Sequence, residues 1–309
     1  MPVLSVHLIT FNNEMHIEET LQSILNQKVD FEYEIVVGDD CSSDRTLEII
    51  TDYSEKHPGL FKILKNESQL GILKNFKATL DRCTGKYVFD IAGDDLFNTE
   101  HALQKMVAIL QSDDSLGFVD SGFDEYIEYA NTTNRYSNKT LIESDKDAYK
   151  KAILSGAFTP IGICFNREKI YQYVDFDTYI KMNVGIEDYP MLVDLIMNTS
   201  VETIKESLHI YRVHKTSYSH TKKLEDLMFQ KQQMMELFNY FTNKYNFNTS
   251  LVHRYYQNHY KHSLYLAGYF EDGKLGKKMF SKINSKNIRD YIHYWASQNK
   301  LFRKLVSLF

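Results

Sequence analysis

Residues 87–95 read YVFDIAGDD, a short apolar run that ends abruptly in a small residue, a glycine and two adjacent carboxylates. The run has the length and β-rich composition of a buried strand. In a parallel sheet, ligands gather at the carboxyl ends of the strands. There, Asp94 and Asp95 would offer hard oxygen ligands, which suit Mg2+ or Mn2+ and, through the metal, a diphosphate. Taken alone, the pair is explained more simply as turn residues that cap a helix starting near Asn98.

Strands and helices alternate ahead of this stretch. Strands are predicted over residues 3–9, 34–38 and 61–64 from their β-branched composition. The first ends at Thr10-Phe11-Asn12 and the second at Asp39-Asp40, so a polar turn follows each. This alternation predicts an α/β fold with a mostly parallel sheet covered by helices on both faces. With right-handed crossovers, the turns converge on one crevice.

Helices are predicted between these strands from apolar residues at helical spacing. The first is expected to start at Asn13, whose side chain is a suitable N-cap. A later helix over residues 72–80 carries Lys74, and another covers residues 101–110. A polar stretch over residues 130–146 predicts a surface loop. Residues 117–129 mix apolar and acidic residues and are predicted to contain strand and loop, and the remaining strand candidates are residues 161–166 and 203–213.

Glu187 and Asp188 form a third acidic turn, directly before Pro190. Proline favours the first turn of a helix, so a helix is predicted to start here. The simplest explanation of the two acids is that they complement the dipole of that helix. They gain a functional explanation only if this turn reaches the same crevice as the other acidic turns.

The pattern changes near residue 220, where the strands stop and long helical stretches begin. We therefore predict one domain over residues 1–220 and a helical region over residues 221–309. The last twenty residues place apolar side chains along one side and Lys300, Arg303 and Lys304 apart from them. A basic amphipathic helix lies well on an anionic membrane surface. Packing on the chain's own body, or on a second subunit in a homodimer, explains the pattern at least as well.

The composition limits which classes of partner and which cellular compartment are expected. The net charge of −5 gives no global basic field, so no nucleic-acid partner is expected. Three widely spaced cysteines argue against a disulfide framework or a zinc cluster and for a reducing compartment. No run of about 18 apolar residues is present, and no signal peptide precedes the first strand. We therefore expect a cytoplasmic protein.

The ordered set of these motifs resembles the family 2 glycosyltransferases of the GT-A fold over residues 1–220. Each piece alone is weak, whereas their order along the chain is specific. The pieces are Thr10-Phe11-Asn12, Val37-Gly38-Asp39-Asp40-Cys41-Ser42, the loop 66–71 before Lys74-Asn75, Ala92-Gly93-Asp94-Asp95, Glu187-Asp188, and Tyr211-Arg212-Val213-His214 with Ser217 and Ser219.

The resemblance implies a nucleotide-sugar site. Thr10, Phe11 and Asn12 match the turn that lines the nucleoside pocket of the family. Asp40 matches the acid that hydrogen-bonds uracil in better-known members, which makes Asp39 the residue that holds the turn. Lys74 falls where an arginine often stands near the diphosphate. By resemblance, the carrier nucleotide is a uridine diphosphate (UDP).

The resemblance also implies a divalent metal, Mn2+ or Mg2+. Asp94 and Asp95 match the end of the family's Asp-X-Asp motif, with Asp95 as the direct ligand and Asp94 near the ribose or the metal. The fuller motif has an acid at the position of Ala92, so this chain offers the metal fewer protein ligands. His214 matches a histidine that completes the metal site in some members.

For catalysis, the resemblance makes Asp188 the general base, supported by Glu187. One base and in-line attack on the donor predict inversion at the anomeric carbon. A retaining glycosidase needs a second carboxylate as nucleophile, and the sequence offers no compelling candidate for it. The transferred group would be hexosyl or N-acetylhexosaminyl. The acceptor would be a hydroxyl of a glycan or a lipid-linked glycan, in assembly of a bacterial capsule, O-antigen or similar polysaccharide at the inner face of the membrane.

Other classes fit the sequence less well. A nucleotidyltransferase or a dinucleotide-dependent dehydrogenase would carry glycines in the loop after the first strand, where this chain has Thr10-Phe11-Asn12-Asn13-Glu14. The run Gly268–Lys274 resembles a phosphate-binding loop, but no strand precedes it, so we attribute the match to chance. A non-catalytic subunit that binds nucleotide or carbohydrate on the same fold stays open. The pair Glu187-Asp188 argues against it, because a pure binder needs no base.

Overall fold

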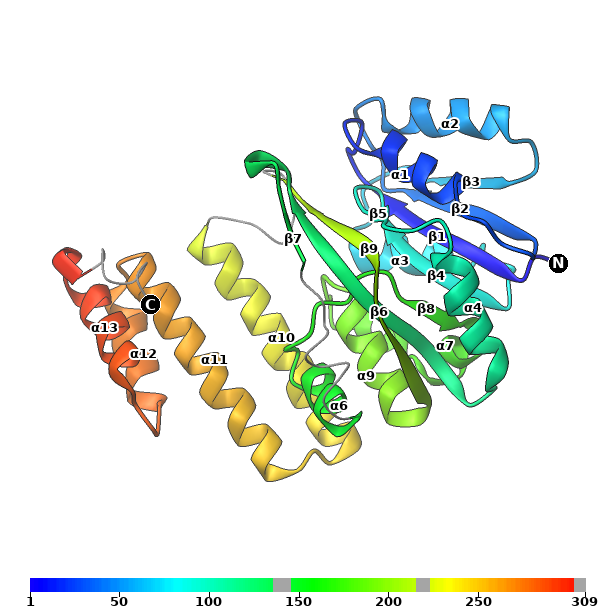
Figure 1. Ribbon diagram of the computed structural model, residues 1–309. Helices are drawn as coiled ribbons and strands as arrows, with labels where there is room; N and C mark the ends of the chain where they lie inside the picture. The colour runs from blue at the N-terminus through cyan, green and yellow to red at the C-terminus, as the bar shows by residue number, and fades with distance from the viewer. Residues whose placement is uncertain (136–145, 215–222, 303–309) are drawn as a thin grey trace. The chain divides into compact units, whose positions relative to one another are not determined.

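The computed structural model describes residues 1–135, 146–214 and 223–302 (Figure 1). The chain divides into two compact units, residues 1–217 and residues 218–309. The first unit contains the sheet, and the second contains long helices.

Four parallel strands form one half of the sheet in the first unit, and their β-branched runs are those expected from the sequence. Their order is β3-β2-β1-β4. The chain builds outward from β1 to β3 and then returns to place β4 on the other side of β1. Such a reversal is a topological switch point, and a crevice forms at the carboxyl ends of the strands there. The strands are β1 (Leu4–Thr10), β2 (Tyr33–Asp39), β3 (Phe61–Lys65) and β4 (Tyr87–Ala92).

The other half of the sheet mixes parallel and antiparallel pairs. It continues from β4 in the order β8-β6-β9-β5, and the long strands β6 and β9 run parallel to each other (Figure 1). The predicted loop over residues 130–146 is partly wrong. A 3-10 turn, Glu128–Ala130, is followed by a short strand β7 that pairs with β6, and residues 136–145 lie outside the described residues. The strands are β5 (Leu96–Phe97), β6 (Leu116–Ile127), β7 (Thr132–Asn134), β8 (Cys164–Asn166) and β9 (Ser200–Val213).

Helices cover both faces of the sheet, as predicted. Apolar residues of α1 and α4, such as Leu21 and Met106, are buried with Leu8 and Phe89 of the central strands. On the other face, Phe76 of α3 packs against the ring of His7. The helices of this unit are α1 (Ile17–Leu25), α2 (Thr46–Lys56), α3 (Ile72–Leu80), α4 (Ala102–Ser112), α6 (Lys146–Leu154), α7 (Arg167–Tyr173), α8 (Phe176–Lys181) and α9 (Asp188–Asn198).

The predicted N-cap of the first helix is wrong. Helix α1 begins at Ile17, with His16 at the cap position and no side-chain capping bond. Asn13 contributes its backbone carbonyl instead, which accepts from the backbone N–H of His16 and of Ile17. The backbone N–H of Asn13 donates at 2.7 Å to Oγ1 of Thr46, the first residue of α2. This contact holds Asn13 outside the helix, so α1 begins later than predicted.

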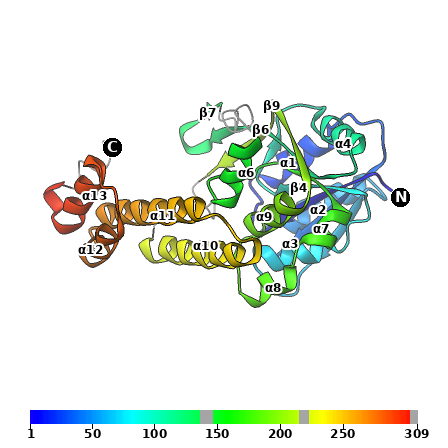
Figure 2. The ribbon, with the colours of Figure 1, turned by 90° about the horizontal axis from the view of Figure 1, so that it is seen from below.

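The second unit is helical (Figure 2). Helix α11 contacts each of the other long helices, and a small core forms around Leu264, Met279 and Ile283. Gly268 lies inside α11, where a Cβ would sit 2.7 Å from the carbonyl oxygen of His293, so it allows α11 and α13 to approach closely. None of the helices in the described parts of the chain is long and apolar enough to cross a bilayer. The helices are α10 (Leu224–Tyr245), α11 (Thr249–Tyr269), α12 (Gly273–Lys282), α13 (Ile288–Gln298) and a 3-10 turn, Lys300–Phe302.

Candidate functional site

The turns after β1 and β2 are joined into one rim at the switch point. Thr10 pairs with Asp39 at the last rung of the two strands, and the carbonyl of Thr10 accepts from the backbone N–H of Asp40 at 2.9 Å. Asn12 adopts a left-handed backbone, with φ of 53°. Its Oδ1 accepts from the backbone N–H of Ser43 at 2.8 Å. Phe11 is 40% exposed on this rim, which leaves its ring free to lie against a planar ligand.

Asp40 orders the loop over residues 66–71. Its carboxylate accepts from the backbone N–H of Leu70 at 2.8 Å and of Gly71 at 2.9 Å, and from the Asn66 amide at 3.0 Å. Asp39 accepts from Ser42 N–H at 3.0 Å, so it holds its own turn. The other oxygen of Asp39, Oδ1, is buried with no hydrogen-bond partner among the described residues. Both aspartates therefore shape the rim, and Asp40 does so across the loop.

The turn after β4 is in close contact with the turn after β1. A Cβ built on Gly93 would lie 2.5 Å from Thr10 Oγ1 and 2.7 Å from Asn13 Nδ2, so only glycine fits here. Thr20 Oγ1 of α1 donates to the Gly93 carbonyl at 3.1 Å and fixes the same turn from the helix side. The hydroxyl of Thr10 is buried without a hydrogen-bond partner in the described parts of the chain. An unpaired buried hydroxyl at a crevice is suited to a ligand.

Arg212 anchors the two aspartates that follow Gly93. Its backbone N–H donates to Asp95 Oδ1 at 3.0 Å, and its Nε donates to the Asp94 carbonyl at 3.0 Å. Its guanidinium pairs with Glu19 and, at 3.5 Å, with Glu128. Burial, followed by the charge of Asp94, raises the pKa of Asp95 well above its usual range. The sequence places Arg212 in a family motif but does not reveal this anchoring role.

His214 lies against Asp94, as a shared site requires. The distance from His214 Nε2 to Asp94 Oδ2 is 2.9 Å, and this hydrogen bond raises the pKa of His214. The rings of His214 and His16 are tilted by 32° to each other with centroids 4.5 Å apart, and His16 Nε2 is 3.0 Å from Glu128 Oε1. Sequence reasoning missed His16, because nothing local marks a histidine before a helix. Ser217 and Ser219 lie outside the described residues.

The acidic pair fits a hard divalent cation in its donor chemistry. In the described parts of the chain, no group of three or more His, Cys, Asp or Glu side chains is arranged to hold a metal ion by itself. Mg2+ and similar ions need no such cage, because they bind through one or two carboxylates together with substrate phosphates. Asp94 and Asp95 provide that number of carboxylates, and Ala92 adds none.

Glu187 and Asp188 stand at the start of α9, partly buried. Asp188 Oδ1 accepts from the backbone N–H of Tyr189 at 2.5 Å. Burial raises the pKa of Asp188 to about 6, and Asp90 adds to the rise. Burial and the neighbouring Asp188 raise the pKa of Glu187 well above its usual range. Two carboxyls with raised pKa values at one turn are typical of a proton-transfer site.

A buried histidine–aspartate pair, missed by sequence reasoning, joins the acidic turns. His7 of β1 and Asp90 of β4 are register partners, and His7 Nδ1 lies 2.7 Å from Asp90 Oδ1. His7 is fully buried, while the Asp90 side chain is about a quarter exposed. The negative charge of Asp90 contributes to the raised pKa values of Asp95, Glu187 and Asp188. The signal in the sequence was an acid interrupting an apolar strand.

Lys74 is not brought into contact with these acids. It is exposed on α3, and no ion pair of Lys74 is found within the described residues. The adjacent Asn75 is buried and holds the loop over residues 66–71, since its Oδ1 accepts from Asn66 and its Nδ2 donates to the Gly38 carbonyl. Between Lys74 and Asn75, the structural role therefore belongs to Asn75.

Sequence comparison identifies relatives for part of the chain. An uncharacterized protein of Mycobacterium tuberculosis is 33% identical over 107 residues, which covers 35% of this chain and 31% of that protein. The poly(ribitol-phosphate) beta-N-acetylglucosaminyltransferase TarS of Staphylococcus aureus is 37% identical over 103 residues, which covers 32% of this chain and 18% of TarS. The match thus spans about a third of the length of the mycobacterial relative.

Solved structures share the fold across almost the whole chain. A crystal structure of TarS residues 1–349 in complex with UDP has a TM-score of 0.57 at 16% identity, covering 98% of this chain and 86% of that one. The mannosyltransferase PcManGT of Pyrobaculum calidifontis, in complex with GDP-Man and Mn2+, has a TM-score of 0.60 at 18% identity, covering 99% and 84%. The sequence profile described as Glycosyl transferase family 2 matches residues 5–169, more than half of the chain. With this match and a GT-A fold, the chain belongs to the family 2 glycosyltransferases.

Proposed function

We propose that this chain is an inverting glycosyltransferase that moves a sugar from a nucleotide-diphosphate donor to a hydroxyl of a glycan or lipid-linked glycan. One observation carries the proposal. The negative charge of one residue, Asp90, raises carboxyl pKa values in two acidic turns, Asp94-Asp95 and Glu187-Asp188, beside the switch point of the sheet. Such a concentration of carboxyls with raised pKa values suits a site that takes up a cation and a proton.

The nucleotide would lie on the rim formed by the turns after β1 and β2. Thr10, Phe11 and Asn12 supply a buried hydroxyl, an exposed ring and a fixed turn. A carboxylate oxygen accepts about two hydrogen bonds. Among the described residues, the carboxylate of Asp40 accepts three and that of Asp39 accepts one. Each can therefore accept a further bond from the base edge of uracil, which donates one. UDP is the proposed carrier, and the UDP complex of the TarS structure supports it. Lys74, which is exposed on α3, is the proposed cation near the diphosphate.

Asp95 and Asp94, with His214 beside them, would hold Mn2+ or Mg2+. When bound, the cation supplies positive charge where the departing diphosphate gains negative charge. Arg212 keeps both aspartates in place through its backbone N–H and its Nε. The Mn2+ in the PcManGT complex supports a metal of this class.

Asp188 would act as the general base. Its pKa of about 6 leaves it mostly ionised at neutral pH and still basic enough to accept the proton of the acceptor hydroxyl as the new C–O bond forms. Glu187, whose pKa is also raised by burial and by Asp188, lies beside this base at the same turn and would support it. Attack from the face opposite the diphosphate inverts the anomeric carbon, and the transferred sugar is proposed to be a hexose or an N-acetylhexosamine.

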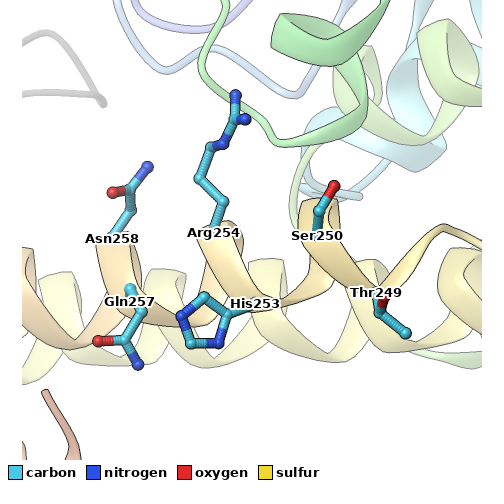
Figure 3. Close-up of a pocket in the computed structure, with 6 residues that line it drawn as sticks. All are labelled: Thr249, Ser250, His253, Arg254, Gln257 and Asn258. Atoms are coloured by element: carbon cyan, nitrogen blue, oxygen red, sulfur yellow. The ribbon is translucent and has the colours of Figure 1, made fainter. Parts of the chain in front are cut away.

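The helical unit would serve the acceptor, a membrane surface or a second copy of the chain. A polar groove on α11 is lined by amide, hydroxyl and imidazole side chains and one guanidinium, with no acid among its described lining residues (Figure 3). Such a lining suits hydroxyl-rich and negatively charged glycans of a surface polysaccharide such as a capsule or O-antigen. The groove residues are Thr249, Ser250, His253, Arg254, Gln257 and Asn258.

The test of this function is a transfer assay with UDP- and GDP-sugars, Mn2+ or Mg2+, and lipid-linked or free glycan acceptors. Proton NMR of the product reads the anomeric configuration. Inverted product with one donor supports the proposal, and retained configuration contradicts the single-base mechanism. Nucleotide binding without any turnover across the panel would favour the non-catalytic binding subunit.

A further inference from the structure

Helix α13 carries two apolar stripes, although a surface helix needs one. The first is buried: Ile292 and Ala296 are at most 7% exposed, on the side that packs on α11. The second faces outward at positions i, i+3 and i+7. Ile288 is 72% exposed, Tyr291 42% and Trp295 46%. Packing among the described residues of this unit, 223–302, therefore does not explain the second stripe.

The outward stripe continues past the end of the helix. The ring centroids of Tyr291 and Trp295 lie 6.0 Å apart, and those of Trp295 and Phe302 lie 5.9 Å apart. Leu301 adds a side chain that is 83% exposed. We call this set the α13 apolar surface; it comprises Ile288, Tyr291, Trp295, Leu301 and Phe302.

The unit that carries this surface has a strongly positive net charge. Residues 218–309 hold 15 of the 36 Lys and Arg residues of the chain but only six of the 41 Asp and Glu residues, a net charge of +9 against −14 for the rest. Arg289 and Lys300 are exposed next to Ile288 and Leu301 in the chain, and Lys300 Nζ lies 3.5 Å from Glu271 Oε2. The one acid of α13, Asp290, is buried, caps its own helix and lies 3.3 Å from Lys261. The net charge of the whole chain hides this asymmetry.

We propose that the α13 apolar surface docks on an anionic lipid bilayer and lies in its interface. Tryptophan and tyrosine favour the boundary between headgroups and acyl chains, and aliphatic side chains such as Ile288 and Leu301 gain by leaving water there. Lysine and arginine are drawn to anionic headgroups. A second copy is the poorer occupant, because pairing this face with itself would bring two units of net charge +9 together. The inference does not depend on sugar transfer.

The chain offers its own probe, because Trp295 is its only tryptophan. We would titrate the full chain with vesicles of phosphatidylcholine alone and of phosphatidylcholine with phosphatidylglycerol. The expected result with the anionic vesicles is a blue shift of Trp295 emission, quenching by brominated lipids and co-sedimentation. Binding should weaken as salt rises, because the attraction between cations and headgroups is screened.

Two double variants separate the apolar and the charged contributions. Ile288→Ser with Leu301→Ser should lower the vesicle affinity roughly tenfold or more, since both side chains leave water on docking. Arg289→Gln with Lys300→Gln should lower it about fivefold for each cation at low salt. The matched controls are Phe229→Ser, at a side chain that is 59% exposed on α10, and Lys151→Glu, at an exposed lysine of α6. Both controls should keep the affinity of the unaltered chain.

Three results would overturn the proposal. The first is unchanged Trp295 emission with anionic vesicles. The second is a blue shift that grows with protein concentration in the absence of lipid, together with a dimer mass by ultracentrifugation, which would assign the surface to a second copy. The third is equal binding to a soluble polyanion such as heparin by the unaltered chain and the Ile288→Ser, Leu301→Ser variant, with no binding to vesicles.

Discussion

His7 Nδ1 lies 2.7 Å from Asp90 Oδ1, and His7 Nε2 lies 3.0 Å from the carbonyl oxygen of Phe76. A carbonyl only accepts, so Nε2 carries a proton and the ring is fixed from both sides. The fully buried histidine thereby holds a partly exposed carboxylate in one orientation between the two acidic turns. The pairing of β1 with β4 thus fixes the position of the Asp90 charge, which raises pKa values in both acidic turns.

The first prediction concerns Asp90. Its charge contributes to the raised pKa of Asp188, so Asp90→Asn should lower that pKa from about 6. Asp188 works as a base when ionised, so activity should rise with pH through about 6 in the unaltered chain and at lower pH in the variant. The measurement is the pH profile of kcat/KM. An acidic limb at the same pH in both proteins would show that Asp90 does not act on the base.

The second prediction concerns Asp188 itself. Asp188→Asn keeps the size of the side chain and removes the base, so turnover should fall by roughly 10²–10⁴-fold. Nucleotide affinity should stay nearly unchanged, because the loss belongs to the transition state. Steady-state kinetics and nucleotide titration check the two halves. Asp177→Asn, at an exposed aspartate of α8, is the matched control. Full turnover in Asp188→Asn would remove this residue from the mechanism.

The third prediction concerns the contact between the turns after β1 and β4. In Gly93→Ala, the new methyl would lie 2.5 Å from Thr10 Oγ1, so the turns must separate. We expect a loss of about 1–3 kcal/mol in the free energy of unfolding. Thr10→Ala removes the clashing oxygen, and denaturant unfolding of the double variant should recover part of the loss. Simple additivity of the two changes would mean that the residues do not contact each other.

The fourth prediction concerns stability against pH. Burial raises the pKa of Asp120 in β6 from 3.8 to about 7. A carboxyl with a raised pKa in the folded state contributes stability at low pH, and this contribution is lost as pH rises through that interval. Thermal unfolding should thus show a stability loss between about pH 4 and pH 7 that is smaller in Asp120→Asn. An identical pH dependence in both proteins would contradict the assignment.

The parallel half of the sheet and most helices are predictable from the sequence, because apolar periodicity is local and strong there. The alternation from β1 to β4 is enough for a mostly parallel α/β sheet, and the family motifs add the GT-A fold and the roles of the turns by resemblance. The N-cap at Asn13 was wrong, since the turn after β2 competes for that segment through Thr46. Residue type alone does not report such a contact.

The missed site residues depend on long-range pairing. His7 and Asp90 are 83 residues apart in the chain, and Arg212 reaches Asp95 across 117 residues. Each of these side chains looks ordinary in its own strand. Their roles follow only from the strand order, which brings β1 beside β4 and joins β5, after the Asp94-Asp95 turn, to β9.

The most direct test of the central claim is a calorimetric titration of UDP into the chain with and without Mn2+. The comparison variant is Asp95→Asn, whose amide oxygen still accepts from the backbone N–H of Arg212 while the charge is removed. We predict tight binding that depends on Mn2+ in the unaltered chain and a loss of that dependence in the variant. Equal affinity of both proteins in Mn2+, or no binding of UDP to either, would contradict the proposed donor site.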